Sequence, residues 1–106
     1  MNFFLNKKVG VLGVSRTGIS SIKFLKKEGF LVFGWDDNQE VLKKIKKKIK
    51  NFKILNSKNV KNIEFLIVSP GIPSKGIKKH KILKIAKKND IELINDIELF
   101  YRFNPE

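Results

Sequence analysis

Short apolar runs alternate along this chain with stretches whose apolar residues recur at helical spacing, and this alternation limits the possible folds more than any other feature. The apolar runs cover residues 9–12, 30–35, 52–55, 63–68 and 91–94. Helical spacing marks the segments around 19–28, 42–50, 79–88 and 96–103. Strands that alternate with helices assemble into a parallel sheet. We therefore expect an α/β fold: a Rossmann-like, doubly wound, mainly parallel five-stranded sheet with helices on both faces.

A single domain over residues 1–106 fits the length of the chain, which has no internal repeat or linker. The chain has no cysteine and one histidine, His80, so we expect no disulfide framework, zinc-thiolate site or other metal site. No apolar stretch approaches the ~18 residues of a membrane span, and the first eight residues are too polar for a signal peptide. These features predict a cytoplasmic chain without a membrane partner.

The formal charge of +13 raises the possibility of a nucleic-acid partner. In the densest lysine run, however, Leu42, Ile45 and Ile49 have the spacing of one helix face. This pattern predicts a helix with a buried apolar stripe and a solvated lysine face. The chain also lacks an arginine cluster and zinc-finger spacing, so a nucleic-acid partner is the less favoured interpretation.

Three polar or glycine-rich segments follow predicted strands, at residues 13–18, 36–38 and 69–73. Ligands of doubly wound sheets bind beyond the carboxyl ends of the strands, near the point where the strand order reverses. We therefore expect the three segments to converge there and to form the ligand site.

The first segment predicts a phosphate or nucleotide site without specifying which. Gly13 and Gly18 match the outer glycines of G-x-G-x-x-G, but Ser15 stands at the middle glycine, which disfavours a nicotinamide dinucleotide. The outer glycines also have the spacing of a P-loop, but Ile19 replaces the phosphate-binding lysine of that motif. A plain strand-to-helix turn is the alternative.

Polar side chains in the first two segments add candidate contacts. Arg16 offers a charge and Thr17 a hydroxyl, either to a phosphate or to the start of a helix. Asp36 lies near the ~20-residue interval after the first glycine at which an acidic residue binds a ribose. A helix cap formed by Asp36, Asp37 or Asn38 is an equally natural interpretation, and different members of this trio can serve both purposes.

The third segment, residues 69–73, contains two prolines that stiffen it and Gly71, which lets the backbone approach a ligand. A rigid turn without a ligand explains these residues equally well. Outside the three segments we expect Trp35 in the core, no chemical role for His80, and Asp96 as the cap of the last helix.

Four segments resemble the N-terminal domain of the D-glutamate-adding branch of the Mur ligase family. They are Gly13–Ser20, Trp35–Asn38, Val68–Pro73 and Asn95–Phe100. The Ser-Pro-Gly-Ile-Pro and Asp-Ile-Glu-Leu-Phe pieces at this separation are specific to that branch, and the resemblance covers essentially the whole chain. Ser15 and Asn95 depart from the pattern, because the family often has glycine at the first position and has glycine at the second.

The resemblance implies that this domain holds the uridine diphosphate part of UDP-N-acetylmuramoyl-L-alanine. Arg16 and Thr17 would meet the nucleotide, residues 36–38 would face the uracil and ribose, and Gly71 would offer its backbone. The implied substrate-binding residues are Ser15, Arg16, Thr17, Gly18, Asp36, Asp37, Asn38, Ser69, Pro70 and Gly71, and no catalytic residue is implied.

The resemblance also implies a whole enzyme that forms an amide in peptidoglycan precursor synthesis. Such a ligase uses ATP and magnesium to make an acyl phosphate, which D-glutamate attacks. The family binds ATP in a central domain and D-glutamate further on, so we expect no cofactor and no catalysis in this domain alone. Its partners would be the substrate and the absent ATPase and C-terminal domains. The alternatives are an NAD(P)-binding domain of an oxidoreductase, favoured by Asp36, and a basic nucleic-acid-binding module.

Overall fold

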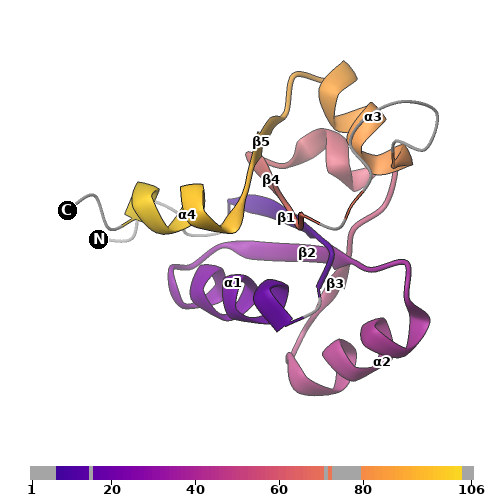
Figure 1. The fold of residues 1–106 in the computed structure, drawn as a ribbon, viewed down its shortest axis with the longest axis vertical. Coiled ribbons are helices and arrows are strands. Elements are labelled where there is room, and N and C mark those ends of the chain that lie inside the picture. Colours follow the sequence, from indigo (N-terminus) through magenta and orange to yellow (C-terminus); the bar gives the residue numbers. More distant parts are fainter. Residues whose placement is uncertain (1–6, 15, 71, 73–79, 104–106) are drawn as a thin grey trace.

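The fold is a five-stranded, all-parallel sheet with helices packed on both faces (Figure 1). The computed structural model describes residues 7–14, 16–70, 72 and 80–103, without the side chains of Arg16 and Thr17. The strands are β1 Lys8–Leu12, β2 Leu31–Trp35, β3 Lys53–Ile54, β4 Phe65–Val68 and β5 Glu92–Ile94. The helices are α1 Arg16–Lys27, α2 Gln39–Lys48, the 3-10 turn η1 Asn59–Asn62, α3 Lys81–Lys88 and α4 Asp96–Phe103.

The strand order is β3-β2-β1-β4-β5, so the first strand lies at the centre. Leu12, at the end of β1, pairs with Trp35 of β2 on one side and with Val68 of β4 on the other. The chain runs outward from β1 in one direction and then returns to build the other half. This order confirms the predicted doubly wound sheet, and it places the switch point between the carboxyl ends of β1 and β4.

The core consists of two clusters, one on each face of the sheet. Val9 and Val11 of β1 belong to the cluster under α1, α2 and α4, whereas Leu12 belongs to the cluster under α3 and η1. Figure 1 shows α3 on the opposite side of the strands from α1 and α2. Side chains alternate between the two faces along a strand. Because β1 is apolar at nearly every position, it contributes side chains to both clusters.

The lysine-rich segment folds as the sequence predicts. In α2 and its C-cap, Leu42, Ile45 and Ile49 are 4%, 1% and 5% exposed, and the lysines between them are exposed. The lysines lie on the outer face of an amphipathic helix, because the isoleucine stripe faces the core. Within the described part of the chain, no helix is both long enough and apolar enough to cross a membrane.

Two local features differ from the predictions. The turn η1 was not predicted, because side-chain hydrogen bonds rather than an apolar period hold it: Asn59 accepts from the Asn56 N–H and donates to the Ile54 carbonyl.

The predicted cap of α4 by Asp96 is wrong. Asn95 accepts from the Glu98 N–H at 2.7 Å, and the Glu98 carboxylate accepts from the Asn95 N–H at 3.1 Å. This reciprocal capping box places Asp96 inside the first turn.

Candidate functional site

The loops after β1, β2 and β4 meet at one edge of the sheet. Gly13 donates its N–H to the carbonyl of Trp35 at 2.8 Å, and Ser69 donates its N–H to the carbonyl of Leu12 at 2.9 Å. These bonds continue the parallel ladders past the ends of the strands. The three segments singled out in the sequence are therefore neighbours in space, as expected for the ligand-binding edge of this fold.

Two glycines allow the loops to pack closely. Gly13 has a φ of +91°, and a Cβ added to it would lie 2.5 Å from the Cβ of Ser69. A Cβ on Gly18 would overlap the carbonyl oxygen of Gly13, so α1 starts directly against the end of β1. Any larger residue at these positions would force the loops apart. The outer glycines of the sequence motif thus have a structural reason that is independent of any ligand.

Asp36 joins the loop after β2 to the loop after β1. Its Oδ2 accepts the N–H of Val14 at 3.0 Å, and its Oδ1 accepts the N–H of Asn38 at 2.8 Å. Each carboxylate oxygen can accept a second hydrogen bond, so the residue retains acceptor capacity for a ligand. Because the bond to Val14 spans 22 residues, Asp36 fixes the relative position of two of the three candidate segments.

The remaining members of the trio have different partners. Asn38 caps α2, since its side chain accepts the N–H groups of Glu40 at 3.0 Å and Val41 at 3.3 Å. This bears out the interpretation of the trio as a source of a helix cap and assigns the cap to Asn38. Asp37 instead bonds to the side chains of Trp35 and His80.

Asp37 accepts two side-chain hydrogen bonds at the same oxygen. Its Oδ1 lies 2.7 Å from Nε1 of Trp35 and 3.0 Å from Nε2 of His80. The hydrogen bond with His80, and after it the hydrogen bond with Trp35, hold the pKa of the Asp37 carboxyl below its ordinary value. The sequence offered no sign of this contact, because Asp37 and His80 are 43 residues apart. Trp35 is half-buried against the core, as predicted, and its indole N–H has this additional role.

Cavities lie on both sides of the three loops. A crevice of about 10 Å³ separates the ends of β1 and β4 and is lined by Gly13, Gly18, Ser69 and Pro70. A hollow of about 290 Å³ lies beyond β2 and β3, lined by Trp35, Ile54–Ser57 and His80–Ile82. The hollow, unlike the crevice, approaches the ~300 Å³ lower limit of ordinary small-molecule pockets.

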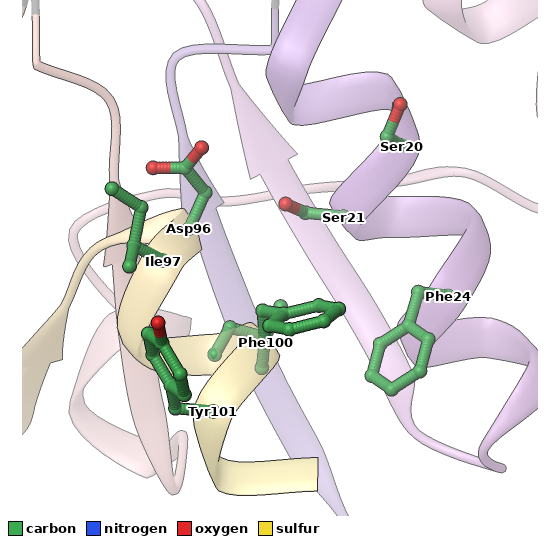
Figure 2. A pocket seen from close by; sticks show the side chains of 8 residues that line it. Ser20, Ser21, Phe24, Asp96, Ile97, Phe100 and Tyr101 are labelled. Carbon is green, nitrogen blue, oxygen red and sulfur yellow. The ribbon is translucent and has the colours of Figure 1, made fainter. Parts of the chain in front are cut away.

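A larger cavity lies elsewhere in the described part of the chain. A groove of about 490 Å³ runs between α1 and α4 (Figure 2). Figure 2 shows Phe24 on α1 and Phe100 on α4 reaching toward the same gap, with Ser20 and Ser21 above them. The groove shares Ser21 and Asp96 with the crevice at the switch point, so the two adjoin. Sequence reasoning missed it because it depends on how two distant helices pack.

Several predicted site residues cannot be placed in full. Ser15 and Gly71 lie outside the described residues, as do the side chains of Arg16 and Thr17. Ser69 is half-buried and Pro70 is exposed. Among the residues that are described, no three histidine, aspartate or glutamate side chains gather as metal ligands would.

Comparison with known proteins identifies the family. The model of the Mur ligase MurD-like N-terminal domain matches residues 7–95, which include all three loops and all five strands. The chain belongs to the MurD-like family of Mur ligases. The matched residues end directly before α4.

Named relatives support the assignment. The UDP-N-acetylmuramoylalanine–D-glutamate ligase of Wolbachia pipientis is 35% identical in an alignment of 102 residues that covers 94% of this chain and 19% of the relative. The corresponding ligase of Caldicellulosiruptor saccharolyticus is 36% identical in an alignment of 105 residues that covers 92% of this chain and 22% of the relative. This MurD-like chain therefore spans about a fifth of the length of the ligases that it matches.

A solved structure supports the fold. Shikimate dehydrogenase from Aquifex aeolicus superposes with a TM-score of 0.63 at 20% identity, over 97% of this chain and 50% of that one. At this identity the likeness shows a shared Rossmann-like architecture. It carries no assignment of ligand, since this architecture hosts many unrelated functions.

Proposed function

We propose that this MurD-like domain holds the uridine diphosphate part of UDP-N-acetylmuramoyl-L-alanine for a ligase that adds D-glutamate in peptidoglycan precursor synthesis. The observation that carries the proposal is the convergence of the loops after β1, β2 and β4 at the switch point, in a chain of this family. Nucleotides bind at this position in doubly wound sheets.

We place the diphosphate at the start of α1. This helix begins at Arg16, three residues after the positive-φ turn at Gly13, and its first turn presents backbone N–H groups and the positive end of the helix dipole. The net charge of +13 adds a long-range attraction for an anionic ligand. The proposed contacts are Ser15, Arg16, Thr17 and Gly18, together with Ser69, Pro70 and Gly71 from the segment after β4.

The nucleoside fits beyond β2. Residues 36–38 follow this strand, and the hollow of about 290 Å³ is lined by the half-buried Trp35 together with the polar residues Asn56 and Lys81. An aromatic wall with a few polar groups is the usual lining of a site for a planar ring. We place the uracil and ribose at this end of the site and the diphosphate at the α1 end.

The chemical step belongs to other parts of the ligase in this proposal. After Gly18 the chain continues Ile19-Ser20, without the lysine that a P-loop uses for the phosphates of ATP. ATP and magnesium, which form the acyl phosphate in this family, are therefore proposed to bind outside residues 1–106. The domain alone is expected to bind the uridine nucleotide in the cytoplasm and to catalyse nothing.

Helix α4 is the proposed contact with the rest of the ligase. Its Ile97 and Tyr101 are 60% and 62% exposed, and it lies beyond the residues matched by the family model. Large apolar side chains exposed together commonly mark an interface. Amide hydrogen exchange in α4 is expected to be slower in the whole ligase than in this chain alone, and equal exchange would argue against the contact.

Heteronuclear NMR titration tests the binding function directly. With UDP-N-acetylmuramoyl-L-alanine we expect saturable shifts at Gly18, residues 36–38 and Ser69. NADH and a short DNA duplex are the matched controls for the two alternatives, which Asp36 and the lysine-rich surface respectively favour. Saturable NADH binding without a response to the uridine ligand would refute the proposal. Preferential binding of the duplex would instead indicate that the positively charged surface binds nucleic acid.

A further inference from the structure

His80 has a side chain that is only 12% exposed, and both of its ring nitrogens have partners. Nδ1 accepts the N–H of Ile82 at 3.0 Å and thereby caps α3. Nε2 lies 3.0 Å from Oδ1 of Asp37. Because a nitrogen that accepts an N–H carries no proton, the ring proton must be on Nε2, which donates it to Asp37. Both contacts together require the neutral Nε2–H tautomer.

The same contacts orient the carboxylate of Asp37. Trp35 and His80 both donate to Oδ1, from β2 and from the start of α3. Among the residues that the structure describes, none donates to Oδ2, and the Asp37 side chain is 64% exposed. A carboxylate held at one oxygen by two donors keeps its rotamer and presents the other oxygen as an acceptor. Trp35 and His80 also line the hollow in which we place the nucleoside.

We propose that His80 is a positioning residue, which acts through Asp37 to present Oδ2 to a hydroxyl or N–H donor on the nucleoside half of the ligand. This inference rests on the proposed function. It adds that affinity for a uridine nucleotide depends on a residue that lies 43 positions from the loop and caps a different helix. A pre-oriented acceptor improves binding because the ligand does not have to order it.

The two functions of the imidazole can be separated by substitution. In His80→Asn, the short amide retains a side-chain cap for α3, because asparagine is a preferred N-cap residue, but it does not reach Asp37. In His80→Gln, the longer amide places an N–H donor near the position of Nε2. If His80 mattered only as a cap, His80→Asn would bind like the unaltered chain. If it positions Asp37, His80→Gln is the variant that retains affinity.

The experiment uses the 106-residue chain, which contains one histidine and one tryptophan, so each gives a single set of side-chain signals. Long-range ¹H–¹⁵N spectra of the free chain at neutral pH are expected to show the Nε2–H tautomer. UDP titration by calorimetry is expected to show about five- to tenfold weaker binding for His80→Asn and a change within about twofold for His80→Gln. In an Asp37→Ala background, His80→Asn is expected to cause no further loss, since it acts through the missing carboxylate.

The outcomes distinguish this inference from the function on which it rests. An Nδ1–H tautomer, or equal UDP affinity in His80→Asn and the unaltered chain, would overturn the positioning role while leaving UDP binding intact. A further loss from His80→Asn in the Asp37→Ala background would also overturn it. If the unaltered chain shows the Nε2–H tautomer but no UDP binding, the proposed function and the positioning role fail together, and only the hydrogen bonds remain.

Discussion

Replacement of Gly13 by alanine is expected to destabilise the domain by separating the loops after β1 and β4. The added Cβ would lie 2.5 Å from the Cβ of Ser69, at a backbone φ of +91°. A non-glycine residue at positive φ costs about 1–3 kcal/mol, and overpacking costs about 1–3 kcal/mol more. The expected loss in the free energy of unfolding is therefore about 2–6 kcal/mol, a large part of the ~5–15 kcal/mol available to a small domain.

Gly10→Ala, within β1 and three residues before Gly13, is the matched control. Its added Cβ would lie 2.9 Å from the terminal methyl groups of Ile63 and Leu66, which can move, and Gly10 does not have a positive φ. Only the overpacking cost of about 1–3 kcal/mol is expected. Gly13→Ala should therefore be the more harmful of two substitutions that are chemically identical and three residues apart.

The assay is urea unfolding followed by the fluorescence of Trp35, the only tryptophan, whose carbonyl accepts from the Gly13 N–H. The midpoint should fall in proportion to the lost free energy at an unchanged slope. Adding Ser69→Gly removes the Cβ of residue 69, with which the new methyl group overlaps. In the Gly13→Ala background it is expected to recover the stability lost to overpacking, but not the stability lost to the positive φ. The explanation is refuted if Gly13→Ala costs no more than Gly10→Ala and Ser69→Gly restores nothing.

Three further predictions concern charge and burial. Because hydrogen bonds lower the folded-state pKa of Asp37, their stabilisation is fully present above the ordinary carboxyl pKa and is lost as pH falls from there through the lowered folded-state pKa. Urea midpoints measured below about pH 5 should therefore fall less steeply in Asp37→Asn than in the unaltered chain. Leu99→Ala, at a residue that is 3% exposed, is expected to cost about 2–5 kcal/mol, whereas Ile97→Ala, at 60% exposure, should cost within about 0.5 kcal/mol; similar losses by thermal unfolding would contradict the packing of α4. Arg102 bonds both oxygens of Glu92 at 2.8 and 2.6 Å, yet both side chains are more than a third exposed, so Glu92→Gln is expected to cost at most about 1 kcal/mol and less in high salt.

Local sequence signals were sufficient where a structural feature depends only on residues within one short segment. The stripe of Leu42, Ile45 and Ile49 defines its helix, since any helix through these residues has one apolar face. The cap of α4 shows the limit of such signals. Asn95 and Asp96 are both good N-caps, and only the position of the Glu98 carboxylate, which returns to the Asn95 N–H, distinguishes them.

The location of the candidate site was also predictable, because the carboxyl ends of parallel strands must share one edge of the sheet. The connections within the site were not. Asp36 meets Val14 across 22 residues, and Asp37 meets His80 across 43, and each contact exists only once the strands have taken their order. A lone histidine without a nearby acidic residue in the sequence gave no reason to expect a partner.

The sequence alone shows three features: the charge of +13, the alternation of strands with helices, and the loops after Gly13, Trp35 and Val68. They determine the class of fold and the edge at which a ligand is expected, because periodicity and turn chemistry act over a few residues. The tertiary structure decided which side chains meet there. The groove between α1 and α4, the closeness of Gly13 to Ser69 and the tautomer of His80 all depend on distances between segments far apart in the chain.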